Sequence, residues 1–232
     1  MLRKNILAII PARSGSKGIK NKNIYKINGK PLIYYTIKRA KKSKLITRLI
    51  VSTDSKKIKK ICKTYNVDVP FLRPKKISGD NSNILETLIY CTKKLEGSKK
   101  FDYIVLLQPT SPLREKNEID RCINKLIKSK CQSLISLTPL IEPHPVKLKI
   151  IKKGKVFPFL KKEKKDNPPR QTLQKVFKPS GNIYIISRDL LINKKKILSK
   201  NCTYDIIDNN KFLNIDDKSD LLLSKLLLKN FK

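Results

Sequence analysis

The chain is predicted to be an α/β protein with a Rossmann-like, mostly parallel sheet. Short apolar segments alternate with amphipathic segments along most of the 232 residues, and strand–helix–strand units of this kind connect parallel strands. The apolar run Tyr103–Leu107 is continuous instead of alternating, which is typical of a strand that is covered on both faces. The two observations together favour a central sheet between layers of helices.

The individual elements follow from the spacing of the apolar residues. Strands are predicted at Ile6–Ile10, Arg48–Ser52, Val67–Leu72, Tyr103–Leu107, Ser133–Leu137, Asn182–Ser187 and Phe212–Ile215. Helices are predicted at Pro31–Lys42, Ser55–Tyr65, Asn83–Glu96, Lys116–Lys128 and Lys218–Lys229. The polar stretch Arg73–Ser82 is predicted to be a loop.

The regular pattern stops between residues 138 and 178. This stretch is rich in proline and lysine and contains only short strand-like pieces, at Lys147–Ile151 and Lys155–Phe159. The sequence contains no second apolar core. We therefore expect a single domain over residues 1–232 with an inserted arm at 138–178, which is either a hairpin or a contact between subunits.

The composition restricts the classes of partner. The formal net charge is +36, but the lysines are spread over nearly every segment and tryptophan is absent. A nucleic-acid-binding face is a clustered patch of basic residues, so no specific nucleic-acid partner is expected, whereas a positive field attracts anionic substrates. No apolar run reaches the roughly 18 residues of a membrane span. No membrane partner is therefore expected.

The cysteines and the histidine also exclude some kinds of site. The five cysteines are an odd number and contain no C-x-x-C pair, which indicates reduced thiols and argues against a disulfide framework or a zinc site. We therefore expect a cytoplasmic protein. His144 is the single histidine, so a histidine-based metal cluster is excluded.

Polar loops follow four of the predicted strands. The segments ARSGSKG, STD, RP and QPTSPLR come directly after strands, and ligands of open α/β sheets bind at the carboxyl ends of the strands. In ARSGSKG, Gly15 and Gly18 let the backbone approach a ligand, while Arg13, Lys17 and the nearby Lys22 supply charge. The loop lacks the Walker A pattern. It is either a triphosphate site or a solvated basic turn, and QPTSPLR is either a binding loop or a proline-rich connection.

Further motifs accompany these loops in order along the chain. They are Ile10–Gly18 with Lys22-Asn23, Asn28–Leu32, Val51–Asp54, Leu72–Pro74, Leu106–Arg114 and Pro168–Gln171, followed by an NGAIYI-like strand and a terminal DID-like element. With these motifs the chain resembles the acylneuraminate cytidylyltransferases, the CMP-N-acetylneuraminic acid synthetases, over essentially its whole length. The resemblance implies the fold of the nucleotide-diphospho-sugar transferases, a small dimerisation arm at 138–178 and a homodimer.

The resemblance also implies an activity. Members of this family convert CTP and an N-acylneuraminate, a nine-carbon 2-keto sugar acid, into the CMP-sugar and diphosphate. Mg²⁺ is the implied cofactor, with Mn²⁺ as an alternative. The anomeric hydroxyl attacks the α-phosphorus in line, and such a reaction mainly requires positioning and neutralisation of charge.

Roles for individual residues follow from the same resemblance. The residues that would bind CTP are Arg13, Ser16, Lys17, Lys22, Asn23, Arg73 and Ser82. The residues that would bind the sugar acid are Gln108, Lys147 and Arg170, the last two through its carboxylate. The implied catalytic residues are Arg13, Lys17, Lys22 and Asp216, of which the three cations would stabilise the departing diphosphate.

The implied metal site departs from the family pattern. The family offers two carboxylates in DID, whereas this chain reads Asn214-Ile215-Asp216. Positions two apart in an extended segment share a face, so Asn214 and Asp216 are both expected to point into the site. Mg²⁺ accepts amide oxygens as well as carboxylates, which makes Asp216 the main expected ligand and Asn214 a second one. The alternative is that Asp216 and Asp217 only begin the last helix.

Two further interpretations remain open. The sugar acid could be legionaminic or pseudaminic acid instead of a neuraminic acid, because enzymes for these acids share the chemistry and much of the loop. The other interpretation is a basic binding protein or a homologue that has lost catalysis, which the charge and Asn214 support. The presence of Arg13, Lys17, Lys22 and Gln108 together favours the enzyme.

Overall fold

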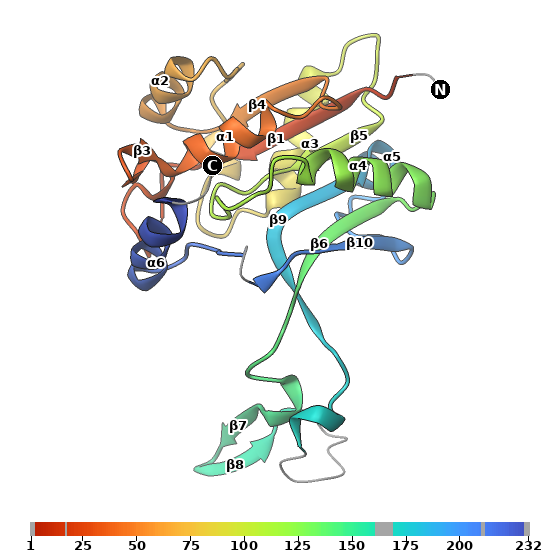
Figure 1. The fold of residues 1–232 in the computed structure, drawn as a ribbon. Helices are drawn as coiled ribbons and strands as arrows, with labels where there is room; N and C mark the ends of the chain where they lie inside the picture. Colours follow the sequence, from red (N-terminus) through yellow and green to blue (C-terminus); the bar gives the residue numbers. More distant parts are fainter. Residues whose placement is uncertain (1–2, 17, 161–168, 210–211, 230–232) are drawn as a thin grey trace.

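The computed structural model describes residues 3–16, 18–160, 169–209 and 212–229. It contains a six-stranded sheet with the strand order β10-β6-β9-β5-β1-β4 (Figure 1). Its strands are β1 Ile6–Pro11, β4 Arg48–Ser52, β5 Tyr103–Leu106, β6 Ser133–Pro139, β9 Phe177–Ser187 and β10 Cys202–Ile206. Strand β9 runs antiparallel to β5 and β6, and the other neighbours are parallel. The prediction of a mostly parallel sheet is confirmed.

Helices cover both faces of this sheet. They are α1 Leu32–Ala40, α2 Lys56–Thr64, α3 Ile84–Leu95, α4 Glu118–Ser129 and α5 Arg188–Ile192, while the last helix is α6 Lys218–Lys229. Along β1, Ala8 and Ile10 pack with apolar residues of α1, α2 and α4, whereas Leu7 and Ile9 pack with those of α3 and α5. Successive side chains of a strand point to opposite faces, so this single strand contributes to both halves of the core.

Helix α6 belongs to a third, smaller cluster beside the sheet. Its Leu221 and Leu228 are buried together with Ile19 and Ile215, and they lie near the short strands β2 (Lys26–Ile27) and β3 (Lys30–Pro31). The amino-terminal end of α6 is closed by a capping box: Asp217 Oδ1 accepts a hydrogen bond from the Asp220 backbone, and Asp220 Oδ2 accepts one from the Asp217 backbone, both at 2.9 Å. The packing and the cap hold the residues that precede α6 against the rest of the domain.

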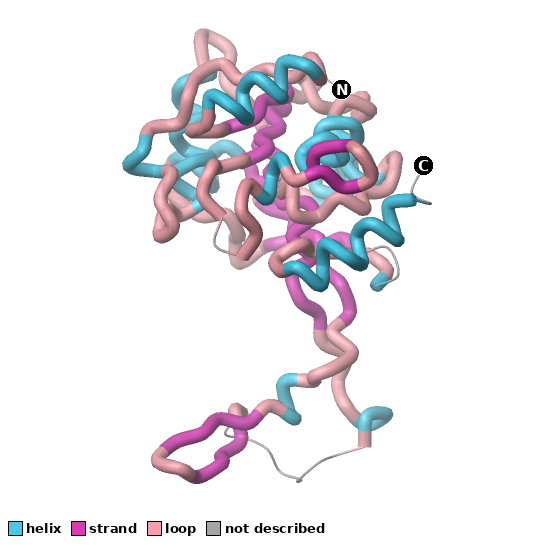
Figure 2. The backbone as a smooth tube through the Cα atoms, turned by 90° about the vertical axis from the view of Figure 1, so that its left-hand side faces the viewer, coloured by secondary structure: helices cyan, strands magenta, loops and turns pink. Residues whose placement is uncertain are grey.

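The expected arm is a hairpin at the end of a two-stranded stalk. Strands β6 and β9 extend away from the sheet and lead to the antiparallel pair β7 (Lys149–Lys152) and β8 (Lys155–Pro158) (Figures 1 and 2). Lys153 and Gly154 in the turn both have positive φ, 48° and 71°, as a tight two-residue hairpin turn requires. The described part of 138–178 is therefore a projecting hairpin, and its role as a dimer contact stays a prediction.

Two predicted strands are wrong. Val67–Leu72 makes only isolated bridges, Ile50 to Asp68 and Thr53 to Leu72, because Pro70 has no backbone N–H for a continuous ladder. In Phe212–Ile215 the structure shows an irregular segment instead of a strand, and Ile215 donates a backbone hydrogen bond to the Thr110 carbonyl.

The elements that were not predicted include β10, the short helix α5 and the two-residue strands β2 and β3. Strand β10 lies at the edge of the sheet, and its five residues lack the continuous apolar run of the inner strands. Among the described residues, no helix is long and apolar enough to cross a bilayer. The five cysteines are free thiols, as predicted.

The stability of the sheet core can be tested with a pair of matched substitutions. Leu7 is fully buried and Leu222 on α6 is 66% exposed. We expect Leu7→Ala to lower the free energy of unfolding by about 2–5 kcal/mol, because it removes buried methyl groups and leaves a cavity. Leu222→Ala should change it by less than about 0.5 kcal/mol. Urea denaturation measures both values, and equal losses would contradict the layer assignment.

Candidate active site

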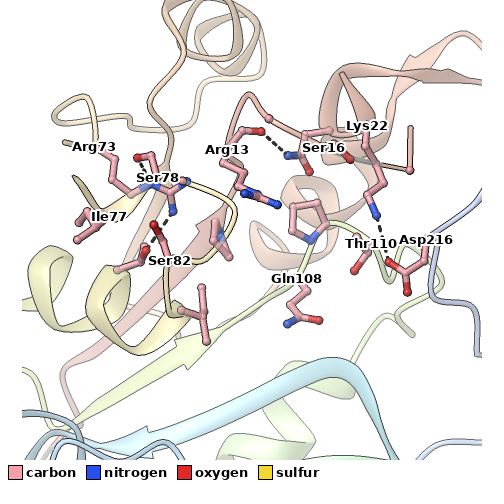
Figure 3. A pocket seen from close by; sticks show the side chains of 18 of the residues that line it. Arg13, Ser16, Lys22, Arg73, Ile77, Ser78, Ser82, Gln108, Thr110 and Asp216 are labelled. Atoms are coloured by element: carbon pink, nitrogen blue, oxygen red, sulfur yellow. Dashed lines mark hydrogen bonds and ion pairs between the residues drawn. The ribbon is translucent and has the colours of Figure 1, made fainter. Parts of the chain in front are cut away.

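The carboxyl ends of β1 and β5 open into a cavity of about 490 Å³. Its walls are the loop after β1, the segment from residue 73 to 87, the loop after β5 and the residues before α6 (Figure 3). The sequence-predicted site residues that line it are Arg13, Ser16, Lys22, Asn23, Arg73, Ser82, Gln108, Asn214 and Asp216. Lys17 lies outside the described residues. The fold thus brings together residues from opposite ends of the chain.

Arg13 connects two walls of this cavity. Its Nη1 lies 2.7 Å from Asp80 Oδ1, and its backbone carbonyl accepts a hydrogen bond from Asn23 Nδ2 at 3.0 Å. Asp80 belongs to the wall that contains Ser82, opposite the loop after β1. The ion pair keeps the guanidinium beside the cavity. The sequence analysis did not predict Asp80, since its partner is 67 positions away.

Asp54 fixes the start of the basic loop. Its two carboxylate oxygens accept hydrogen bonds from the Ser14 backbone at 2.8 Å and from the Ser14 hydroxyl at 2.7 Å. Burial alone would raise the pKa of Asp54, but the bonds from Ser14 and the nearby charge of Arg73 hold that pKa below its ordinary value. Asp54 is therefore ionised at neutral pH, and it anchors the loop electrostatically.

Arg73 supports the wall on the other side of the cavity from Lys22 and Asp216 (Figure 3). Its Nε donates to Ser78 Oγ at 3.0 Å and its Nη1 donates to Thr87 Oγ1 at 3.1 Å. The residue is buried, and this burial lowers the pKa of the guanidinium. These two hydrogen bonds connect the guanidinium to the loop between residues 73 and 82 and to helix α3.

Asp216 is the carboxylate that the structure places in the cavity wall next to a cation. Lys22 Nζ donates to Asp216 Oδ1 at 3.1 Å and to the Ile215 carbonyl at 2.8 Å (Figure 3). Asn214 Nδ2 donates to the other oxygen, Oδ2. Gly18 packs so closely on the Asp216 carbonyl that a Cβ at position 18 would overlap it. The basic loop and the residues before α6 therefore form one tightly packed unit.

A second cavity, of about 540 Å³, adjoins the first. The two cavities share three lining residues, which are Gln108, Asn214 and Asp216. The remaining wall of the second cavity comes from β9, including Gly181, from the segment before α6, and from Asp220 in the first turn of α6. The site therefore has two chambers, and the described carboxylate Asp216 stands at their boundary.

Arg114 holds the loop after β5 in place, and the sequence analysis did not identify it as a site residue. Its guanidinium is fully buried and donates to the backbone carbonyls of Gln108 at 2.7 Å, Ser111 at 2.7 Å and Asn182 at 2.6 and 2.9 Å. Burial lowers its pKa to about 10. The signal in the sequence is an arginine at the end of the proline-rich loop between a predicted strand and a predicted helix.

Two neighbours complete this arrangement. Glu118 is buried, and its Oε1 accepts a hydrogen bond from Asn182 Nδ2 at 3.1 Å, while burial raises the pKa of its carboxyl group. Gly181 has a φ of 74°, and a Cβ there would lie 2.7 Å from Gln108 Oε1. The absence of a side chain at position 181 therefore leaves room for the Gln108 carboxamide at the boundary of the chambers.

The two residues predicted on the arm lie apart from these cavities. Lys147 pairs with Glu142 at 3.2 Å and lines neither chamber. The backbone of Arg170 is in the short helix Arg170–Thr172 of the arm, and its side chain is not described. His144 has a structural role: its Nδ1 accepts from the Val146 backbone at 3.3 Å, and its Nε2 lies 3.0 Å from the Gln174 carbonyl.

Comparison with solved structures identifies the fold as that of a nucleotidyltransferase. A structure titled CMP:2-keto-3-deoxy-manno-octonic acid synthetase complexed with CTP superposes with a TM-score of 0.74 at 16% identity, covering 97% of this chain and 99% of that one. Residues 7–172 match the family model described as cytidylyltransferase. The chain belongs to the cytidylyltransferase family.

Curated relatives agree with this assignment. The CMP-N,N'-diacetyllegionaminic acid synthase of Legionella pneumophila is 32% identical, over 96% of this chain and 96% of its own length. The N-acylneuraminate cytidylyltransferase of Escherichia coli is 32% identical over 96% of this chain, and the match spans 52% of that longer protein. The family predicted from the motifs is confirmed.

The role of Arg114 in holding the loop after β5 can be tested by substitution with lysine. We expect Arg114→Lys to lower the free energy of unfolding by about 2–4 kcal/mol, because a single ammonium cannot reach all the carbonyls and each bond from a charged donor contributes about 1.5–3 kcal/mol. Arg48→Lys is the matched control, since Arg48 forms only an exposed pair with Asp68 and should change stability by less than about 1 kcal/mol. Urea denaturation measures both free energies of unfolding. An unchanged value for Arg114→Lys would contradict the role of Arg114 in holding the loop after β5.

Proposed function

We propose that the protein transfers the cytidylyl group of CTP to a nonulosonic acid, an N-acylneuraminate or a close analogue, and releases diphosphate. The observation that carries this proposal is the two-chambered site, in which Gln108, Asn214 and Asp216 belong to both chambers. The first chamber is lined by Arg13 and Lys22 and suits a nucleoside triphosphate. The second suits a polar sugar acid. Their boundary is where an acceptor hydroxyl would meet the α-phosphorus.

The residues of the first chamber provide what phosphoryl transfer requires. The sugar hydroxyl oxygen forms a bond to the α-phosphorus as the bond from that phosphorus to the bridging oxygen breaks, and diphosphate leaves with the additional negative charge. Arg13 and Lys22 would stabilise this charge through charge-assisted hydrogen bonds. Asp216 would accept or orient the proton of the attacking hydroxyl. Gln108, whose backbone carbonyl is held by the Arg114 guanidinium, would orient the sugar acid.

The side-chain oxygens at the boundary between the two chambers suit a divalent cation. Asn214 Oδ1 is buried and has no hydrogen-bond partner, and the Asp216 side chain is 66% exposed to the cavity. An amide oxygen, a carboxylate, phosphates and water are the oxygen ligands that Mg²⁺ prefers, and Mn²⁺ accepts the same set. When bound, such an ion would neutralise charge on the triphosphate. Asp216 and Asn214 are therefore the residues proposed to hold it.

The identity of the sugar acid is the finer part of the proposal. The relatives named above are a legionaminic acid synthase and an N-acylneuraminate cytidylyltransferase, so both acids are candidates, with pseudaminate as a third. We place N-acylneuraminate first because of the motif resemblance. The free thiols fit a reducing compartment, which supports a cytoplasmic location.

The proposed reaction is tested by measuring diphosphate release from CTP and Mg²⁺ with each sugar acid in turn. We expect release with one of N-acetylneuraminate, legionaminate or pseudaminate, and little with ATP or UTP in place of CTP. Asp216→Asn should lower kcat by about 10²-fold or more if the carboxylate assists proton transfer.

Asp217→Asn is the matched control for this experiment. It removes the same charge one position away and keeps a residue type that caps helices well, so turnover should stay near that of the wild type. No release with any acid would contradict the proposed function. Equal loss of turnover in the two variants would contradict the role of Asp216.

The arm supports a homodimer with shared sites. Its hairpin exposes the apolar residues Ile151, Val156, Phe157 and Phe159, which are between 43% and 77% exposed, and exposed apolar groups of this size are typical of an interface. In a dimer joined through the arms, Lys147 and Arg170 of one subunit would reach the sugar-acid chamber of the other. These two cations would add to Lys178, which lines that chamber in the chain itself.

Subunit mixing tests the shared site. Lys147→Ala and Asp216→Ala should each be nearly inactive, whereas co-refolded mixtures should recover about a quarter of the wild-type activity, since half the dimers are hybrids with one intact site. The molar mass in solution should be that of two chains. A monomeric mass, or no recovery on mixing, would refute the shared site.

A further inference from the structure

The carboxylate of Asp216 is already occupied by donors from the chain itself. Its Oδ1 accepts from Lys22 Nζ at 3.1 Å, and its Oδ2 accepts from Asn214 Nδ2. Lys22 is held at this place by a second bond, to the Ile215 carbonyl at 2.8 Å, and its side chain is only 15% exposed. The ammonium group of Lys22 therefore occupies the position where a metal cation would neutralise Asp216.

The orientation of Asn214 follows from its neighbour. An ionised carboxylate has only acceptor oxygens, so the Asn214 amide directs its nitrogen to Asp216 and its oxygen away from it. That oxygen, Oδ1, is buried without a partner. An unpaired buried acceptor is unfavourable, so a ligand that supplies a donor or a cation at Oδ1 stabilises the site.

A carboxylate at position 214 would behave differently. Two carboxylates in contact repel each other, and a divalent cation between them relieves the repulsion. With an amide at 214 this repulsion is absent, and a single carboxylate remains. Among the described residues there is no group of three or more histidine, cysteine, aspartate or glutamate side chains that could hold a metal ion. Asp217 and Asp220 are near in sequence, but their carboxylates cap α6.

From this geometry we infer that the chain keeps Asp216 neutralised by Lys22 and Asn214, so that a divalent cation binds there only together with the nucleotide. The inference rests on the proposed function and concerns the order of binding. The triphosphate attracts Lys22 Nζ away from Asp216, because several phosphate charges outweigh one carboxylate. Once Lys22 has left, the Asp216 carboxylate, the Asn214 amide turned so that its oxygen faces the carboxylate, and the phosphate oxygens form the oxygen set that a hard cation needs.

The test measures Mn²⁺ binding without turnover, through the relaxation rate of water protons, with no sugar acid present. For the wild type we expect no Mn²⁺ binding to the protein alone at micromolar concentrations. Addition of CTP should give a ternary complex whose relaxation enhancement exceeds that of Mn²⁺ and CTP without protein. Asp216→Asn should remove this excess.

Asn214→Asp is the decisive variant. It restores a pair of carboxylates, so we expect Mn²⁺ to bind the nucleotide-free protein at least about tenfold more tightly than the wild type, because a second charge in contact with the cation adds well over 1.4 kcal/mol of attraction. Asn201→Asp is the matched control, since it adds the same charge in an exposed loop and should bind no better than the wild type. Circular dichroism verifies that both variants are folded.

The possible results separate the inference from the proposed function. Mn²⁺ binding to the nucleotide-free wild type at micromolar concentrations would overturn the inference, and this measurement requires no variant. Folded Asn214→Asp without any gain would overturn it as well. A ternary complex with ATP or UTP but not with CTP would support the inference and refute the proposed nucleotide.

Discussion

The arrangement of the site depends on one buried guanidinium. Arg114 donates to three backbone carbonyls, those of Gln108, Ser111 and Asn182, and so ties the loop after β5 to strand β9. Its charge is expensive to remove from water, and the cost is offset because its donors are used and Glu118 lies nearby. Once this contact has formed, Gln108 can take only a narrow range of positions, and the boundary between the two chambers is defined.

The elements that could be predicted from the sequence are those whose signal is local. Lys218–Lys229 has the predicted bounds, and β4 does too, because apolar spacing alone decides them. Pro70 prevents the predicted third strand, and β10 was missed because an edge strand needs few apolar residues. In each case the deciding factor, a missing backbone donor or a solvent-exposed face, is weakly encoded in the pattern.

The residues of the candidate site show the same difference between local and non-local signals. Basic and amide residues were predicted because their motifs are short and contiguous. Asp80, Arg114 and Glu118 were not, since their partners are distant in sequence or are backbone carbonyls, which carry no residue identity. Lys147 and Arg170 were predicted through resemblance alone, and a single chain does not bring them to the cavities. In the proposed dimer their placement depends on a second subunit, which no pattern within one chain can describe.

The contact between Lys22 and Asp216 joins residues 194 positions apart, which has a consequence for biosynthesis. A ribosome delivers the basic loop among the first residues and Asp216 among the last, and a domain generally folds as a unit. Under the proposed roles, a chain interrupted before residue 212 would carry the cationic half of the site without its carboxylate. The two halves of the candidate site therefore meet only when nearly the whole chain has been made.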